Sequence, residues 1–295
     1  MSRRPIWMER PRLVERLAQG LILSLVVLLV VYPFAEIVST SLAGQADVDA
    51  GGGLVLLPLH PTLRAYQVVF EGGAVTRAIL ISVGVTVVGT LASLATTVAM
   101  AYALSRPILG SRQILRMALL TLFFAPGIIP SYLVVKQLGL LNTYASLVLP
   151  VLLNAFNLVV VRQFFMAVPE ELVDSARLDG AGDLAILLRI VLPLSKAAVA
   201  VIGLFYAVGY WNAFFNALLY LNDQSRWPLQ LILRLYVIQG APLPGVGSYV
   251  TGQAPPPPES IQMAVVVIAL LPIVFAYPFL QRYFTKGVLS GAIKG

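Results

Sequence analysis

The residues of this chain with the most distinctive chemistry form a polar, acid-rich segment, 170–193, between two long apolar stretches. Glu171, Asp174 and Arg177 lie three residues apart, so a helix would place them on one polar surface. A structured polar insert of this kind in a membrane chain indicates a place where something outside the bilayer docks. The chemistry to expect is docking through charged and polar side chains.

The local sequence of this segment predicts two short helices joined by a tight turn. Pro169 suits the first helical turn, and the acidic residues that follow complement the positive helix N-terminus. Gly180 can take the left-handed conformation that closes a helix, and Asp183 is placed to cap the next one. We expect Leu192-Pro193 to end the second helix near the membrane.

Apolar stretches on both sides of the segment account for most of the chain. Of its 295 residues 59% are hydrophobic and 11% are charged, which is the composition of an integral membrane protein. The predicted fold is all-α, a polytopic membrane protein with six transmembrane helices and a cytoplasmic helical loop. We divide the chain into an N-terminal segment 1–17, a membrane domain 18–281 with the loop at 166–196, and a tail 282–295. The six spans are expected at 18–38, 78–104, 115–135, 145–161, 197–220 and 261–280.

The basic residues are distributed unevenly about these spans. Fifteen of the 20 Lys and Arg residues fall on the side that carries both chain ends and the 166–196 loop. Because such an excess is typical of cytoplasmic segments, both termini and the loop are expected in the cytoplasm, and the chain in the cytoplasmic membrane. Nucleic-acid binding is not expected, since the basic residues gather beside apolar spans and form no stripe of their own.

Prolines and small residues mark special points in the predicted spans. Proline removes a backbone donor, so those in the third and sixth spans are expected to bend or break their helices. These prolines are Pro126, Pro130, Pro272 and Pro278. The carbonyls that they free either line a pathway or are satisfied by neighbouring helices. Gly84, Gly89 and Ser93 in the second span would let another helix approach closely.

Several kinds of residue are missing from the sequence. It contains no GxxxxGK[ST] phosphate loop, and therefore no recognisable means of binding ATP by that mechanism. No charged residue or histidine lies in the central part of a predicted span, whereas ion-coupled carriers usually keep one there. This absence favours a transporter that receives its energy from outside the chain over an ion-coupled carrier. The ion-coupled alternative stays open, because sodium can be bound by neutral oxygens alone. Without cysteine, and with His60 expected in a loop, no metal site is predicted.

The 166–196 loop resembles the cytoplasmic coupling loop of ATP-binding-cassette (ABC) importer permeases. The family pattern of an acid, two small residues, a glycine and a later Leu-Pro is matched here by Asp174, Ser175, Ala176, Gly180, Leu192 and Pro193. The longer strings SARLDGAG and RIVLPLSK are most similar to the sugar-importing branch. Two positions depart from the pattern, because the family more often has Glu in place of Asp174 and Pro in place of Ala197. The tail, YPFLQRYFTKGVLSGAIKG, resembles that of one permease in maltose-type importers, where it reaches toward the ATPase.

The resemblance implies a transport subunit that is not an enzyme and binds no cofactor. It implies two copies of a cytoplasmic ATP-binding subunit, which would hold ATP and Mg, and an extracytoplasmic solute-binding protein. It also implies a second six-span permease, either identical or a homologue. The residues expected to couple the spans to the ATPases are Glu171, Asp174, Ala176, Arg177, Gly180 and Pro193.

The strings GLLNTYASLVLP and FYAVGYWNAFFNALLYLND resemble permeases for oligosaccharides, including a subgroup linked to uronate-containing sugars. Sugars are bound by aromatic faces and by paired hydrogen bonds, for which amide side chains are suited. A continuous fifth span would place Asn212 and Asn216 on one face, with Tyr206 and Tyr210 one turn apart. For each amide, a hydrogen bond to a neighbouring helix is the alternative. The candidate substrate pathway consists of Asn154, Asn157, Tyr210, Trp211, Asn212 and Asn216.

An anionic solute could be attracted by Lys136, Arg226 and Arg234, which are expected on the outer side, although solvated loop charges would look the same. Within the family, this chain could also be the gating subunit of a pair.

The preferred hypothesis is the permease subunit of an ATP-driven importer that moves a carbohydrate, such as an oligosaccharide, across the lipid bilayer. A stand-alone ion-coupled secondary carrier is the first alternative, and its transport would survive loss of the loop. A membrane scaffold is the second, and it would transport nothing.

Overall fold

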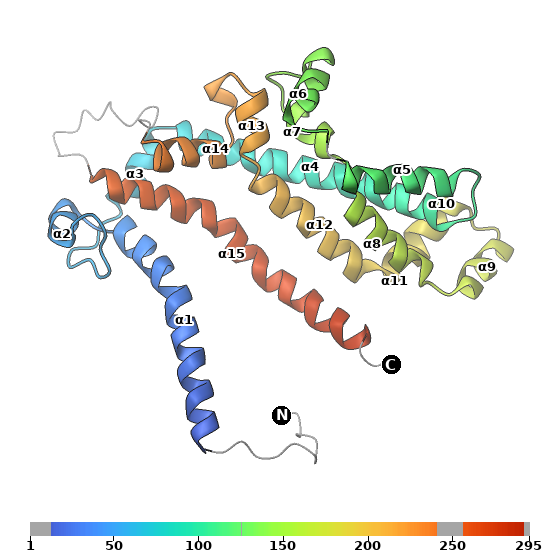
Figure 1. The fold of residues 1–295 in the computed structure, drawn as a ribbon, viewed down its shortest axis with the longest axis horizontal. Helices are drawn as coiled ribbons and strands as arrows, with labels where there is room; N and C mark the ends of the chain where they lie inside the picture. Colours follow the sequence, from blue (N-terminus) through green and yellow to red (C-terminus); the bar gives the residue numbers. More distant parts are fainter. Residues whose placement is uncertain (1–12, 125, 241–255, 292–295) are drawn as a thin grey trace. The chain divides into compact units, whose positions relative to one another are not determined.

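A computed structural model describes residues 13–124, 126–240 and 256–291 of the chain. Within these ranges the chain is helical and contains no strand, as the sequence predicts (Figure 1). The Arg-rich start, the last four residues and most of the proline-rich stretch before α15 lie outside them. The α-helices are α1 (Leu13–Ser41), α2 (Gln45–Gly51), α3 (Arg64–Glu71), α4 (Ala74–Ser105), α5 (Ser111–Phe123), α6 (Ile128–Gln137), α7 (Ala145–Val148), α8 (Ala155–Met166), α9 (Glu170–Leu178), α10 (Asp183–Ile186), α11 (Leu192–Leu194), α12 (Lys196–Trp211), α13 (Phe215–Tyr220), α14 (Leu229–Leu233) and α15 (Pro258–Gly291). Four short helices of other types are the 3-10 turns η1 (Leu149–Val151) and η3 (Gln224–Arg226) and the π-helices η2 (Leu187–Val191) and η4 (Arg234–Ile238).

The chain forms two compact units, and α1, α2, α3 and the first part of α15 belong to the first. Its small core contains Ala43, Val48 and Val55. The Thr40 hydroxyl accepts a hydrogen bond from the backbone N–H of Val55, 2.9 Å away, and so ties the end of α1 to the following loop. His60 lies in this loop, where its own N–H donates to the Asp47 carboxylate.

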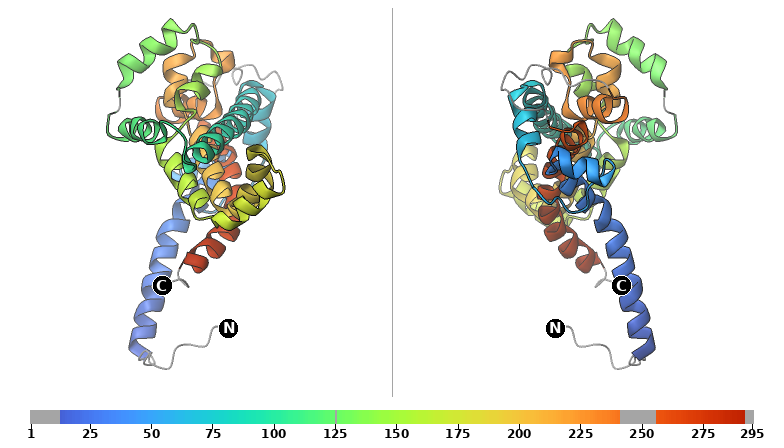
Figure 2. Two further views of the ribbon diagram at one scale, coloured as in Figure 1. Left: turned by 90° about the vertical axis from the view of Figure 1, so that its right-hand side faces the viewer. Right: turned by 90° about the vertical axis from the view of Figure 1, so that its left-hand side faces the viewer.

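The second unit is built around α4, α8 and α12, which lie side by side (Figure 1). Fully buried side chains at their contact include Ala101, Leu158, Val161 and Ile202. At one end of α4 lies the hairpin of α9 and α10, which faces the viewer in the left-hand view of Figure 2. The helices α6, α7 and α13 lie toward the other end (Figure 1). Within this unit, the polar hairpin and the helices α6, α7 and α13 therefore lie toward opposite ends of α4.

Small residues allow α4 and α12 to approach closely. This was predicted for Gly84, Gly89 and Ser93, and it is confirmed for Gly89 and Ser93. A Cβ atom on Gly89 would lie 2.8 Å from the ring of Tyr210, closer than real contacts allow. The Ser93 hydroxyl lies 2.8 Å from the Tyr210 hydroxyl. Gly84 differs, because a Cβ atom there would meet nothing within 4 Å among the described residues.

Three described helices are long and apolar enough to cross a membrane alone: α1, α4 and α15 up to residue 278. Up to five spans result if each of two bent helix pairs is taken as one span. The six-span count therefore stays a prediction. The expected break in the third span occurs at Pro126, between α5 and α6, whereas Pro130 lies inside α6. The sixth span was expected to bend or break at its prolines. A break there is wrong, because α15 continues through Pro272 and Pro278.

The fourth and fifth predicted spans are interrupted where the sequence analysis expected continuous helices. The fourth bends by 57° between η1 and α8, close to Pro150, which lacks a backbone donor. The fifth ends as a helix at Trp211 and resumes at Phe215 as α13. No glycine or proline lies between these two residues, so the local sequence gives no signal for the interruption.

Candidate functional site

The polar hairpin is closed by a glycine-dependent turn. Gly180 has φ of +83°, in the left-handed region that favours glycine. Its N–H donates to the carbonyl of Arg177, and the N–H of Ala181 donates to the carbonyl of Ala176, at 3.0 and 2.9 Å. These two bonds form the Schellman motif that satisfies the last carbonyls of a helix. The predicted role of Gly180 as the residue that ends α9 is confirmed.

Arg177 joins the two arms of the hairpin through its side chain. Its guanidinium lies 3.6 Å from the Asp174 carboxylate on the same helix and 3.8 Å from the Asp183 carboxylate on α10. All three side chains are about half exposed or more. Glu171 is also exposed on α9. The predicted polar surface therefore exists and is open to solvent on this chain.

The opposite side of the hairpin is packed against the rest of the second unit, to which the hairpin itself belongs. Val173 of α9 is 1% exposed and Ile186 of α10 is equally buried, and both belong to the main hydrophobic core. Ala176 is partly buried against the same core, so its side chain does not share the open polar surface. The hairpin is therefore attached to the membrane helices by apolar contact.

Three further contacts add to this connection at the end of α4. The Tyr102 hydroxyl lies 3.5 Å from the Asp183 carboxylate, and the guanidinium of Arg106 stacks on the Tyr102 ring at 5.0 Å. The Nε of Arg162 on α8 donates to the carbonyl of Leu104, at 2.8 Å. The hairpin and the ends of α4 and α8 thus form one connected region.

Two predictions about the second arm of the hairpin are wrong. Gly182, rather than Asp183, is the N-cap of α10, and Asp183 is the first helical residue, with its carboxylate near Arg177 and Tyr102. The helix also does not end at Leu192-Pro193. It continues through η2 and α11 to Leu194, where an 87° bend leads into α12. Pro193 lies in α11, one residue before the end of this continuous helix, and its side chain is exposed.

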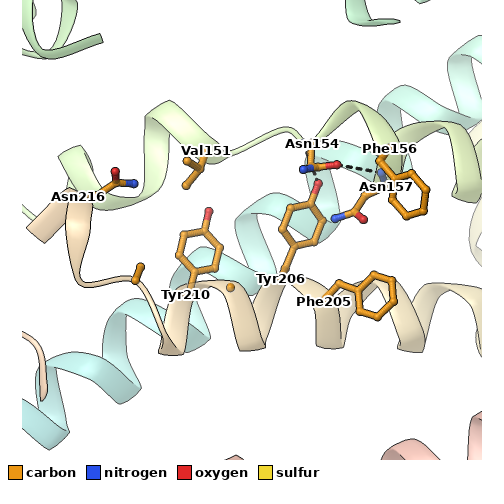
Figure 3. Close-up of a pocket in the computed structure, with 10 residues that line it drawn as sticks. Val151, Asn154, Phe156, Asn157, Phe205, Tyr206, Tyr210 and Asn216 are labelled. Carbon is orange, nitrogen blue, oxygen red and sulfur yellow. Dashed lines mark hydrogen bonds between the residues drawn. The ribbon is translucent and has the colours of Figure 1, made fainter. Parts of the chain in front are cut away.

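A pocket of about 340 Å³ lies between α12, α13 and the broken fourth span (Figure 3). Its described lining carries aromatic rings and amides, and none of these described residues is Asp, Glu, Lys, Arg or His. The lining residues are Val151, Asn154, Phe156, Asn157, Phe205, Tyr206, Gly209, Tyr210, Ala213 and Asn216.

The two tyrosines of α12 hold the broken span in place. The Tyr206 hydroxyl lies 2.7 Å from the Thr97 hydroxyl on α4 and accepts a hydrogen bond from the backbone N–H of Asn154, at 3.0 Å. The Tyr210 hydroxyl donates to the carbonyl of Val148, at 3.4 Å. Since a lipid-embedded break must have its backbone groups satisfied, these hydroxyls stabilise the interruption beside the pocket.

The amides of the pocket divide into one structural residue and two without partners. Asn154 caps α8, because its Oδ1 accepts from the N–H of Asn157 at 3.1 Å. The amides of Asn157 and Asn216 make no hydrogen bond to the described part of the chain, although Asn157 is 5% exposed. Asn216 is partly buried, and both amides line the pocket, so they are free to form hydrogen bonds with a polar ligand there.

Trp211 and Asn212 were predicted in the pathway but do not line this pocket. Trp211 is buried, and its Nε1–H donates to the carbonyl of Ala269 on α15, at 3.1 Å. The Asn212 side chain donates to the carbonyl of Val208 on its own helix. The interruption after Trp211 separates them from Asn216, because the expected face of Asn212 and Asn216 requires a continuous helix.

Sequence reasoning missed the apolar part of the pocket. Phe156 and Phe205 supply rings from α8 and α12, and nothing in their spacing distinguishes them from lipid-facing residues. A signal for Tyr206 was present, because Tyr206 and Tyr210 on one span match Thr97 and Ser93 on another at the same spacing.

Comparisons with known proteins identify the family of this chain. The profile of the family described as binding-protein-dependent transport system inner membrane component matches residues 93–290. The chain is 42% identical over 285 residues to the polygalacturonan/rhamnogalacturonan transport system permease protein YtcP of Bacillus subtilis (strain 168), covering 96% of this chain and 99% of that protein. It is 44% identical over 266 residues to Protein LplC of the same organism, covering 90% of each.

A solved structure is similar over nearly the whole chain. It is the crystal structure of a bacterial ABC transporter involved in the import of the acidic polysaccharide alginate, with a TM-score of 0.84 and 29% identity over 94% of this chain and 100% of that chain. Permeases of this family are transport subunits rather than enzymes, and their ATPase is a separate subunit. These findings favour the importer over the secondary carrier, and with the apolar helices they indicate a multi-pass protein of the inner membrane. The chain belongs to the family of binding-protein-dependent transport system inner membrane components.

Proposed function

We propose that this chain is the permease subunit of an ABC importer that carries a carbohydrate, and that the carbohydrate is an acidic oligosaccharide. The observation that carries the proposal is the pocket with two unpartnered amides, Asn157 and Asn216, beside the rings of Phe156 and Phe205. Amides pair with sugar hydroxyls and aromatic rings cover apolar sugar faces. The names of two similar proteins, which concern polygalacturonan, rhamnogalacturonan and alginate, support the acidic class.

The polar hairpin is the proposed connection to the energy source. Its exposed residues Glu171, Asp174 and Arg177 would contact a groove of a cytoplasmic ATPase, while the Gly180 turn holds the two arms together. Ala176 and Pro193 would act from the packed side and from the far end of the hairpin. Two ATPase copies would bind ATP and Mg, and this chain would bind no cofactor. Both termini and the hairpin would then lie in the cytoplasm.

A second six-span permease, a homologue of this chain, would complete the pathway across the membrane, and an extracytoplasmic binding protein would deliver the solute. The family is defined by dependence on a binding protein, which supports the second of these partners. Purification of the tagged chain from gently solubilised native membranes, followed by mass spectrometry, tests both. Recovery of this chain alone from a folded preparation would contradict the assembly.

The substrate pocket is tested by uptake in vesicles that contain the complete transporter. Asn216→Leu removes an unpartnered pocket amide while keeping a similar volume, and we expect uptake to fall about tenfold, the equivalent of roughly 1.4 kcal/mol. Asn212→Leu is the matched control, because Asn212 is an exposed asparagine three positions beyond the lining residue Gly209 and outside the pocket. Equal effects of the two substitutions would contradict the assignment of the pocket.

A further inference from the structure

Three basic side chains were candidates for attracting an anionic solute, and the structure separates them. Arg226 is already occupied, since its Nε lies 3.5 Å from the Asp223 carboxylate and its guanidinium donates to the carbonyl of Asn142. Lys136 is exposed on α6. Arg234 is partly buried, and no carboxylate of the described residues lies within ion-pair distance of it.

Arg234 is held in place by an aromatic ring. Its guanidinium carbon lies 4.5 Å from the centre of the Phe214 ring, a cation–π arrangement. Its Nε is buried and has no hydrogen-bond partner among the described residues. Arg234 is also the first residue of the π-helix η4, a type of helix that occurs frequently at functional sites. The side chain is therefore oriented without having its donors used.

Phe214 connects this cation to the pocket. It lies in the interruption between α12 and α13, directly after the lining residue Ala213 and two positions before the lining residue Asn216. None of the described lining residues is basic. A solute with a carboxylate would therefore find neutral donors inside the pocket, and an oriented cation is stacked on the ring that follows the lining residue Ala213 in the chain.

We propose that Arg234 recognises a carboxylate of the acidic oligosaccharide and thereby determines the preference of the permease for acidic over neutral sugars. This inference rests on the proposed function. Arginine presents a planar fork of donors that matches a carboxylate, and stacking on a ring reduces the freedom lost when it binds. Lysine would keep the charge but lose both the fork and the planar stacking.

The test uses the complete transporter, with its partner permease, ATPase and binding protein, in sealed vesicles. The probes are oligosaccharides prepared from polygalacturonan and from alginate, each also supplied after chemical reduction of its carboxyl groups to neutral sugars. For Arg234→Gln we expect about tenfold lower uptake of the acidic set, the equivalent of roughly 1.4 kcal/mol, and unchanged uptake of the reduced set. Lys136→Gln tests for a general field effect of the outer basic residues, and an equal loss of acidic uptake in Lys136→Gln and Arg234→Gln would overturn the specific role of Arg234.

The outcomes separate this inference from the proposed function. Absence of uptake of either set by the wild type would overturn both. Wild-type uptake that prefers the reduced set, or equal losses of both sets in Arg234→Gln, would overturn the role of Arg234 alone. Where the wild type carries only the acidic set, Arg234→Lys must retain more uptake than Arg234→Gln, and equal losses would overturn the inference. An effect seen only in vesicles of anionic lipid would instead assign Arg234 to headgroup phosphates, and would also overturn it.

Discussion

The guanidinium of Arg177 lies 3.8 Å from the carboxylate of Asp183, across the turn that Gly180 closes. The same guanidinium lies 3.6 Å from Asp174, so one cation serves an acid on each arm of the hairpin. Both arms are therefore held by the turn and by one shared side chain, while their apolar sides are fixed by the core. An ATPase groove that binds the exposed surface of the hairpin would therefore move α9 and α10 together.

The Gly180 turn gives a prediction about coupling. Gly180→Val forces a β-branched residue into left-handed backbone, which costs about 1–2 kcal/mol and distorts the turn. We expect transport and solute-stimulated ATP hydrolysis to fall at least about tenfold, with normal insertion into the membrane. Gly182→Ala is the control, because Gly182 has φ of −73° and open space around it. Full transport by Gly180→Val would argue against the coupling role of this hairpin.

The ion pair of Arg177 and Asp183 is predicted to contribute little to stability. Both side chains are exposed, by 48% and 74%, and exposed pairs are typically worth about 0.2–1 kcal/mol. A double-mutant cycle with Arg177→Ala and Asp183→Asn, followed by unfolding in detergent, measures the coupling free energy. A value well above this range would show that the pair is shielded from solvent in the purified protein.

Close packing of α4 and α12 predicts different effects at two glycines of one helix. Gly89→Ala places a methyl group 2.8 Å from the Tyr210 ring, and overpacking of this kind costs about 1–3 kcal/mol. Gly84→Ala adds the same methyl group where nothing lies within 4 Å on this chain. Thermal unfolding of the two purified variants is the measurement. Equal stabilities would contradict the contact between Gly89 and Tyr210.

The Tyr206 hydroxyl is predicted to stabilise the broken fourth span. Tyr206→Phe leaves the Asn154 N–H and the Thr97 hydroxyl without this partner, and an unsatisfied buried group costs about 1–3 kcal/mol. We expect faster hydrogen exchange at residues 152–157 in this variant. Tyr220→Phe is the control, because Tyr220 is buried and stacked on Tyr132 but its hydroxyl makes no hydrogen bond among the described residues.

Asp223, in the loop after α13, gives a prediction about pH. Hydrogen bonds from the Ser225 hydroxyl and N–H, followed by the charges of Arg226 and Arg77, lower the pKa of Asp223 below its ordinary value of 3.8. A lowered pKa means that the carboxylate stabilises this loop above pH about 4 and that the contribution is lost as the pH falls through the lowered pKa. Transport near neutral pH should not respond to this group.

A titration of the Asp223 carboxyl carbon by NMR measures this pKa directly. Ser225→Ala removes the side-chain hydrogen bond, which is the largest cause, and is expected to raise the pKa toward 3.8. An unchanged pKa of Asp223 in Ser225→Ala would show that a group other than the Ser225 hydroxyl lowers it.

The sequence was sufficient where local chemistry decides the structure. The all-α fold follows from apolar stretches long enough to span a bilayer, and the turn at Gly180 follows from the conformational freedom of glycine. The break at Pro126 was expected from a missing donor, although Pro272 and Pro278, which lack the same donor, lie inside α15. Each of these features depends on residues close together in the chain.

Features that depend on contacts between distant residues were not predictable from the sequence. The interruption after Trp211 has no glycine or proline, so it arises from tertiary packing, and it separates Asn212 from Asn216. Whether an amide pairs with a neighbouring helix also requires the fold, because Asn154 turned out to cap α8 while Asn157 has no partner among the described residues. Arg234 and Phe214 are twenty positions apart, and only the fold brings them together.

The absence of Asp, Glu, Lys, Arg and His from the pocket lining has an electrical consequence. Moving one elementary charge across 100 mV changes its free energy by about 2.3 kcal/mol. An anion that enters a cell with a negative interior moves against this potential, and the described lining of the pocket carries no cation that neutralises it on the way. The electrical work would then grow with every carboxylate on the imported chain. A neutral sugar in the same pocket would require none, so import of acidic and neutral sugars should respond differently to the membrane voltage.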